Sequence, residues 1–350
     1  MRIFTLDYLR AILAVGIMIA HYALWACGPG DAVLFSTRLE IYSVPMFYLL
    51  SGITIHLSYS HKLKLNSKGL KVFFSNRIKR LAPLYYLATV LTIVLFRQVP
   101  DARTVFTNLT GLFSIYNWDI LIVYGGWSLG NELVFYAAFP VLLWLSRHSQ
   151  PKYIATLIFL FFIYAYFAFF KLDNTRTFIS QWKTYINPLN QLFLFGLGTA
   201  ISSKLRHIKL SGYIAAALIL IGIFTIYQYP ISGDRSHLIT GAPRIIFTIA
   251  CICIIVGIFK AEFRLPENMH KAIMLIAKSS YSIYLLHPIV YRLVMKTFSI
   301  ALNHGLSIPF AVQVTVSALA TLGISYLAYL KFQLLFLEPQ KPKLVVSALS

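Results

Sequence analysis

The sequence predicts an all-α, polytopic membrane protein, a helix bundle of about ten transmembrane helices with both termini in the cytoplasm. Apolar residues make up 58% of the 350 residues and charged residues only 12%, which is more apolar surface than one soluble core of ordinary size can bury. Mostly apolar stretches of about 20 residues, the length that crosses a bilayer, recur along nearly the whole chain. This composition excludes a soluble enzyme, a secreted disulfide scaffold and a disordered protein.

Hydropathy defines the candidate spans one after another. The first begins with Asp7 and Arg10 and lacks a small-residue cleavage site, so we expect a retained helix rather than a signal peptide. Residues 1–335 are predicted to form one integral membrane domain, and residues 336–350 a short cytoplasmic tail. The longest predicted extracytoplasmic connection, 98–127, can dip back into the membrane. The ten spans lie at about residues 8–27, 41–59, 81–97, 128–146, 153–170, 187–203, 211–229, 244–259, 279–298 and 309–330.

The basic residues set the predicted orientation. With a cytoplasmic N-terminus, 21 of the 31 Lys and Arg residues lie in or beside cytoplasmic connections, and the positive-inside rule then places both termini in the cytoplasm. This topology accounts for the net charge of +20, so no nucleic-acid partner is expected. Cys27, Cys251 and Cys253 are odd in number and lack metal-ligand spacing, so we expect buried thiols rather than disulfides or a metal site.

Ionisable residues inside the spans are the first functional candidates, because a charged group in the apolar layer is costly. Arg10 and His21 are eleven residues apart, so they share one face of the first helix about 16 Å apart along its axis. Asp7 lies one turn before Arg10 and can pair with it. Imidazole titrates near neutral pH, so His21 suits base chemistry. The alternatives are a membrane-interface anchor for Arg10 and a packed, hydrogen-bonded His21.

Charged residues also mark the third and fourth spans. Arg77 and Arg80 open the third span on one side of the helix, where two guanidinium groups can hold phosphates bidentately. Ordinary topology also places basic residues there. Glu132 follows Gly125-Gly126 in the first turns of the fourth span. Its carboxylate can orient a histidine or simply complement the helix dipole.

The ninth span begins Ser280-Tyr281-Ser282-Ile283-Tyr284 and continues to His287-Pro288. Tyr284 and His287 are three residues apart and share a face, and Pro288 frees a carbonyl near the imidazole. We expect the tyrosines mainly to pack between helices. For His287, a ligand role and a packing role remain equally open.

Together these motifs resemble the acyltransferase-3 family of bacterial membrane acyltransferases, which modify cell-surface glycans. Each motif is weak alone, but five in the family's order over residues 1–335 are specific. Asn131 stands where many members carry an acid, and no hydrolase-like domain follows the last span, so a stand-alone enzyme is expected. The matching segments are Leu6–Arg10 with His21, Phe47–Gly52 including Ser51, Arg77–Arg80, Trp127-Ser128-Leu129 with Glu132, Phe135, Tyr136 and Pro140, and Ser280–His287.

The resemblance implies transfer of an acyl group, expected to be acetyl, from cytoplasmic acyl-CoA to a hydroxyl of a cell-surface or lipid-linked glycan such as O-antigen or exopolysaccharide. The location would be the bacterial inner membrane. No permanently bound cofactor and no metal are expected, because acetyl-CoA is a co-substrate. His21 and Glu132 would be catalytic, with Glu132 orienting His21 as general base or acyl acceptor. Arg10, Arg77 and Arg80 would bind the donor, supported by Asp7, Ser51, Trp127, Ser128, Tyr136, Tyr284 and His287.

A proton-coupled secondary transporter is the alternative function. His21, Glu132 and His287 would then form a proton relay within the membrane. Such transporters usually contain inverted repeats, and none is visible in this sequence. The paired arginines also have no evident task in a proton relay, so the acyltransferase is favoured.

Overall fold

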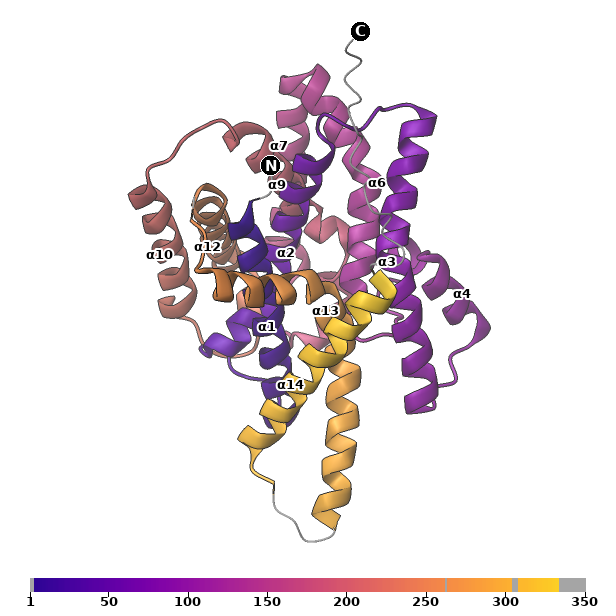
Figure 1. The fold of residues 1–350 in the computed structure, drawn as a ribbon. Coiled ribbons are helices and arrows are strands. Elements are labelled where there is room, and N and C mark those ends of the chain that lie inside the picture. The colour runs from indigo at the N-terminus through magenta and orange to yellow at the C-terminus, as the bar shows by residue number, and fades with distance from the viewer. Residues whose placement is uncertain (1–2, 262, 304–307, 334–350) are drawn as a thin grey trace.

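The computed structural model describes residues 3–261, 263–303 and 308–333, and this part of the chain is helical without any strand. The predicted tail at 336–350 lies outside the described residues. Each of the ten predicted spans coincides with a helix, and Figure 1 shows these helices gathered into one bundle. They are α1 (Phe4–Cys27), α2 (Phe35–Tyr59), α3 (Ser67–Phe96), α6 (Gly126–His148), α7 (Gln150–Tyr166), α9 (Pro188–Leu205), α10 (Gly212–Gln228), α12 (Gly241–Lys260), α13 (Glu267–Asn303) and α14 (Phe310–Ala328).

Eight helices in the described part of the chain are long and apolar enough to cross a membrane, which confirms the polytopic prediction. Of the ten helices at predicted spans, α9 and α10 are not among these eight. Helix α10 is a shorter apolar helix. Helix α9 packs against α2, α6 and α7 and buries Asn190, Gln191, Thr199 and Ser202. Because its sides meet protein, α9 carries more polar residues than a lipid-facing helix tolerates.

Short helices fill the connections. The predicted extracytoplasmic connection contains α4 (Ala102–Thr110) and α5 (Phe113–Tyr116), and α5 packs against α6. Asn108 fixes this segment, because its Oδ1 accepts from the Tyr85 hydroxyl at 2.9 Å and from the Ile122 amide at 3.2 Å. The remaining short elements are η1 (Phe167–Lys171), η2 (Ile179–Gln181), α8 (Trp182–Tyr185), α11 (Ser236–Ile239) and η3 (Tyr329–Gln333).

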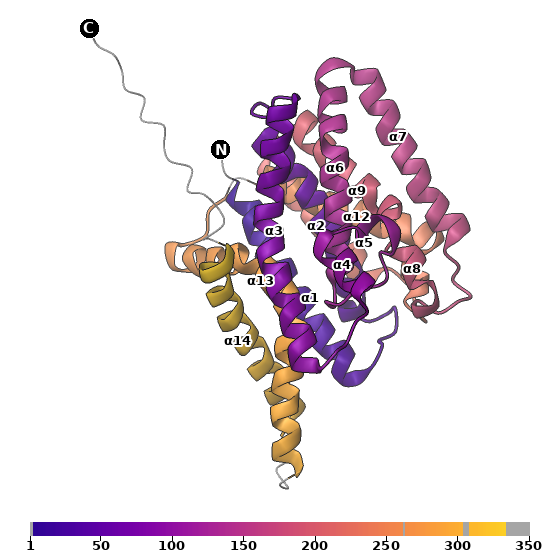
Figure 2. The same cartoon turned by 90° about the vertical axis from the view of Figure 1, so that its right-hand side faces the viewer.

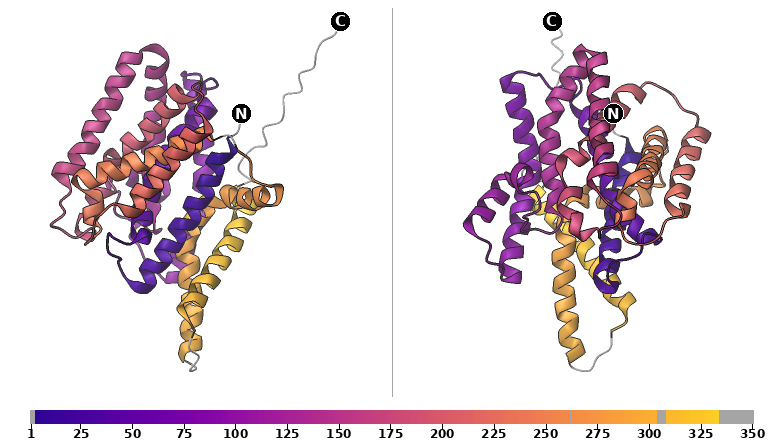
Figure 3. Two further views of the ribbon diagram at one scale, coloured as in Figure 1. Left: turned by 90° about the vertical axis from the view of Figure 1, so that its left-hand side faces the viewer. Right: turned by 180° about the vertical axis from the view of Figure 1, so that it is seen from behind.

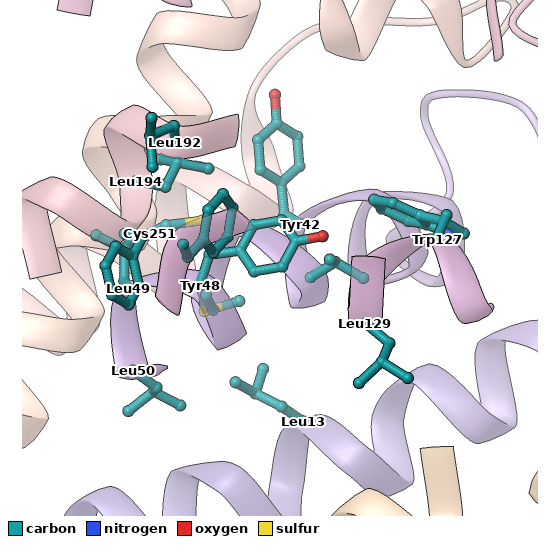
Figure 4. Packing of buried hydrophobic residues seen from close by; sticks show 14 of the residues in the cluster. Leu13, Tyr42, Tyr48, Leu49, Leu50, Trp127, Leu129, Leu192, Leu194 and Cys251 are labelled. Carbon is teal, nitrogen blue, oxygen red and sulfur yellow. The ribbon is translucent and has the colours of Figure 1, made fainter. Parts of the chain in front are cut away.

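Helix α2 runs through the core. Figure 4 shows Tyr42, Tyr48 and Leu49 of α2 among buried side chains of α6 and α9. Helices α2 and α9 approach closely where Gly52 and Gly198 face each other: a Cβ on Gly198 would overlap the carbonyl oxygen of Leu49. Small residues allow this contact, which is how helices in membranes gain van der Waals packing.

Replacement of Gly198 by alanine is therefore expected to destabilise the protein by about 1–3 kcal/mol, the usual effect of overpacking a tight contact. Thermal unfolding of the detergent-solubilised protein would measure the effect. Gly323→Ala in α14 is the matched control, because a Cβ there meets nothing within 4 Å. Equal melting temperatures for the two variants would show that the α2–α9 contact is not needed for stability.

One end of the bundle holds the N-terminus, and we call it the N-terminal end. The connections α2–α3, α6–α7, α9–α10 and α12–α13 lie at this end (Figures 1 and 3). Arg147 joins the first two by donating to the carbonyls of Ser60 and Leu63, and Lys260 joins the last two by donating to the carbonyls of Leu205 and Ile208. The sequence-derived basic clusters thus meet at one end of the bundle.

The far end is reached by α1 and by the α13–α14 hairpin, which extends beyond the other helices in Figures 1 and 2. Helix α13 packs against both α1 and α14, and His287 and Tyr291 in its middle lie beside the C-terminal half of α1. Cys27, at the end of α1, is exposed, whereas Cys251 is buried and Cys253 half-buried. The prediction of buried thiols is therefore wrong for Cys27, because α1 ends at the surface.

Candidate active site

Two histidines from opposite ends of the sequence meet between α1 and α13. Nδ1 of His21 lies 2.9 Å from Nε2 of His287, and the two rings are nearly parallel, at 7°. Both side chains are buried, with exposed fractions of 8% and 1%. Trp25, one turn after His21 in α1, stacks on both rings at centroid distances of 5.4 and 5.6 Å. The pair is therefore held by a hydrogen bond and by aromatic packing.

The hydrogen bonds assign the tautomers of the neutral pair. Nδ1 of His287 lies 3.0 Å from the carbonyl oxygen of Ile283, and a carbonyl only accepts, so Nδ1 carries the proton. Nε2 of His287 is then an acceptor, and the Nδ1–H of His21 donates to it. This leaves Nε2 of His21 with a free lone pair and no hydrogen-bond partner among the described residues. A neutral imidazole with a free lone pair can accept a proton.

His21 lines a cavity of about 650 Å³, which we call the histidine pocket. Its size and its aromatic walls with a few charged groups are typical of a small-molecule site. Burial raises the pKa of the Tyr185 phenol, so this wall residue is neutral at physiological pH. The aromatic lining is Trp25, Phe96, Tyr124, Trp127, Phe178, Trp182, Tyr185 and Tyr284, and the charged lining is Glu40, Asp119, Arg235 and Arg292.

A buried ion pair forms part of one wall of the histidine pocket. The Arg235 guanidinium lies 2.9 Å from the Glu40 carboxylate, and the side chains are only 6% and 11% exposed. The loop before α11 positions Arg235, because the Asp234 carboxylate accepts from the amides of Phe178 and Ser236. Although partial burial opposes it, these hydrogen bonds lower the pKa of Asp234. Glu40 and Arg235 were not identified as site residues from the sequence. Each lies near the start of a helix, where charged residues are common and give no sign of a function.

A second, smaller cavity of about 130 Å³ lies toward the N-terminal end, and we call it the arginine pocket. Arg77 and Arg80 both line it, as their three-residue spacing predicts. Arg10 also lines it and pairs with Asp7 at 2.9 Å, again as the spacing predicts. Arg77 donates to the Tyr59 hydroxyl at 3.0 Å. The lining also contains Ser51, Thr54, Ser128, Glu132, Tyr136, Ser280, Tyr281 and Tyr284.

Glu132 belongs to the arginine pocket, where its carboxylate accepts from the Tyr136 hydroxyl. The prediction that Glu132 orients His21 is wrong, because His287 takes that position. The helical face of α6 that carries Glu132 and Tyr136 is turned toward the two arginines of α3. Asn131, beside it, is buried and donates to the Tyr48 hydroxyl at 3.0 Å. The transporter relay also loses support, since Glu132 and His21 line different pockets.

Tyr284 and Val44 line both pockets and so form the wall between them. The Tyr284 hydroxyl donates to the carbonyl oxygen of Gly125 at 3.1 Å. Gly125 has a φ of +79°, and a Cβ there would lie 3.2 Å from the tyrosine oxygen, so only glycine fits without strain. Trp127, two residues after Gly125, lines the histidine pocket, whereas Ser128 lines the arginine pocket. The start of α6 thus borders both cavities.

In a comparison with known protein families, residues 3–330 of the chain match a family model described as an acyltransferase domain. The chain is also similar to the O-acetyltransferase OatA of Staphylococcus aureus strains NCTC 8325 / PS 47 and COL. Each is 26% identical over 321 residues, which covers 81% of this chain and 50% of the relative. The chain thus spans about half the length of the curated relatives it matches. No solved structure matches it.

Proposed function

Because this chain belongs to the acyltransferase-3 family, we propose that it is an O-acetyltransferase that moves an acetyl group from acetyl-CoA to a hydroxyl of a cell-surface or lipid-linked glycan. The observation that carries the proposal is the pair of adjoining pockets. One is lined by three arginines and the other by a histidine with a free lone pair. The glycan class follows the family resemblance, with O-antigen and exopolysaccharide as the candidates.

In the proposed reaction the donor enters through the arginine pocket, and its thioester passes Tyr284 into the histidine pocket. Nε2 of His21 takes the proton from the acceptor hydroxyl while the hydroxyl oxygen attacks the thioester carbonyl. The C–S bond then breaks, and the His21 imidazolium returns the proton to the departing thiolate. His287 keeps accepting from Nδ1–H of His21 throughout, which holds the ring in place and favours its charged form.

The histidine pocket supports direct transfer to the acceptor. Its volume of about 650 Å³ is within the usual range for a ligand site, so a sugar residue fits beside the thioester. Aromatic side chains offer apolar faces to the sugar ring, and Glu40, Asp119 and Arg235 offer hydrogen bonds to its hydroxyls. An acyl group carried first on Nε2 of His21 would use the same lone pair.

Mass spectrometry of the surface polysaccharide tests the proposed function. Glycans from cells with the gene should carry the added mass of one acetyl group per modified residue, and glycans from cells without it should lack that mass. Addition of the wild-type gene on a plasmid should restore the mass. Identical glycans with and without the gene would contradict an acetyltransferase acting on this class of acceptor.

We also propose that the N-terminal end of the bundle faces the cytoplasm, where acetyl-CoA is made, in the bacterial inner membrane. The excess of basic residues at this end supports that orientation. The acceptor would then reach the histidine pocket from the opposite side. Transfer of the acetyl group would occur within the membrane, between the two entrances.

Cysteine labelling in intact cells is expected to follow this orientation. After Cys27, Cys251 and Cys253 are replaced, a membrane-impermeant maleimide should react with Val99→Cys but not with Lys71→Cys. Both positions are exposed in the structure, with Val99 96% exposed, so protection of Lys71→Cys reports the membrane and not burial. Permeabilised cells, in which both variants should react, are the control. The reverse pattern would overturn the orientation.

A further inference from the structure

We propose that the nucleotide part of acyl-CoA binds in a cavity between the end of α2 and the start of α3, which shares Arg77 with the arginine pocket. This inference rests on the proposed donor. The cavity has a volume of about 820 Å³, and we call it the lysine cavity. Its polar and charged lining is Ser58, Tyr59, Lys62, Lys64, Asn66, Lys68, Asn76 and Arg77.

The charge of the lysine cavity suits phosphate groups. Its lining contains three lysines and one arginine but no Asp or Glu, and residues 60–80 of the sequence contain no acid. Lys62, Lys64 and Lys68 are exposed, and none of the ion pairs among the described residues includes them. Helix α3 also begins at this cavity, at Ser67, so its N-terminal amides and dipole add to the positive potential. Acyl-CoA carries a diphosphate and a 3′-phosphate at its nucleotide end.

Arg77 connects the lysine cavity to the arginine pocket, because it lines both. Its guanidinium lies close to two aromatic rings, 5.1 Å from the centroid of Tyr59 and 5.8 Å from that of Tyr136. Nε of Arg77 is buried without a hydrogen-bond partner among the described residues. A buried donor without a partner is costly, and a phosphate oxygen or an amide carbonyl of a bound donor would satisfy it.

The three cavities occur in an order that matches the chemistry of acyl-CoA. The lysines come first, then Arg77, then the small arginine pocket, then Tyr284, and last His21 in the histidine pocket. A ligand with phosphates at one end, an uncharged chain in the middle and a thioester at the other end fits this order. The same lysines would also attract anionic lipid headgroups, so the experiment must separate the two sources of phosphate.

The test compares donors that lack successive parts of the nucleotide. Affinities for acetyl-CoA, 3′-dephospho-acetyl-CoA and acetyl-pantetheine are measured by calorimetry in nanodiscs of neutral lipid. The triple variant Lys62→Gln/Lys64→Gln/Lys68→Gln loses three exposed charge contacts to the phosphates. Because each such contact contributes little, we expect the variant to bind acetyl-CoA about tenfold more weakly. The loss should be smaller for the dephospho donor and absent for acetyl-pantetheine. Lys152→Gln/Lys209→Gln/Lys271→Gln removes as many exposed lysines from the same end, outside the cavity, and should bind like wild type.

The outcomes separate this inference from the proposed function. If wild type does not bind acetyl-CoA, the proposed donor is wrong and the nucleotide site falls with it. If wild type binds acetyl-CoA and the cavity variant binds it equally well, the donor stands and the nucleotide site is overturned. An equal loss of affinity for all three donors would also overturn the nucleotide site, because the lysines would then support the folded structure rather than contact the phosphates. Single Lys64→Gln, with an expected loss of about twofold, keeps the test open if the triple variant does not fold.

Discussion

Alanine at position 21 is expected to abolish acetyl transfer, lowering the rate by about 10²–10⁴-fold, the usual contribution of a general base. Among the described residues that line the histidine pocket, His21 is the only histidine. Its ring is hydrogen-bonded to His287 through Nδ1, and Nε2 keeps a free lone pair. The remaining arginine pocket should still bind the donor. Initial rates with radiolabelled acetyl-CoA and a glycan acceptor, together with donor affinity, would measure the effect.

The matched control for this experiment is His56→Ala. His56 is buried to the same extent as His21, with exposed fractions of 9% and 8%. It also lies in a long helix and makes one side-chain hydrogen bond, from Nδ1 to the Ser202 hydroxyl at 2.9 Å. It lines neither the histidine nor the arginine pocket. Full acetylation by a well-expressed His21→Ala variant, or an equal loss in both variants, would refute the assignment of His21 as the base.

Loss of His287 is expected to have the second largest effect, about 10–100-fold on kcat, because residues that orient a catalytic group typically contribute this much. Alanine at 287 removes the acceptor for Nδ1–H of His21, so that ring can rotate or change tautomer. His287→Gln should recover part of the activity, since an amide oxygen also accepts a hydrogen bond. The measurement is kcat and KM for acetyl-CoA in both variants.

A merely structural role for His287 would give a different result. The ring packs against Trp25 and lies close to Tyr22, so a packing defect would lower protein yield and raise KM with little selective change in kcat. Our interpretation requires a fall in kcat at nearly constant KM. It also requires rescue by glutamine but not by leucine, which fills space without accepting a hydrogen bond.

The sequence by itself determined which segments are helices and which side chains share a helix face. Hydropathy located all ten long helices, because the cost of apolar exposure is a property of each segment. The pairs Asp7–Arg10 and Arg77–Arg80 lie on common faces as predicted, because helical periodicity fixes neighbours three residues apart. The collection of basic residues at one end of the bundle also follows from the order of spans and connections. All of these relations are local in the chain.

Only the tertiary structure decided which helix faces meet. His21 and His287 are 266 residues apart, and nothing in either helix states how far each is rotated about its axis or which helix lies beside it. Glu132 was assigned to His21 from its residue type, but the packing of α6 turns it toward Arg77 and Arg80. Glu40 and Arg235 join a wall of the histidine pocket from separate elements. The rotation of each helix about its axis, and which helices lie beside it, depend on how all the helices pack together, because each contact between two helices restricts the others.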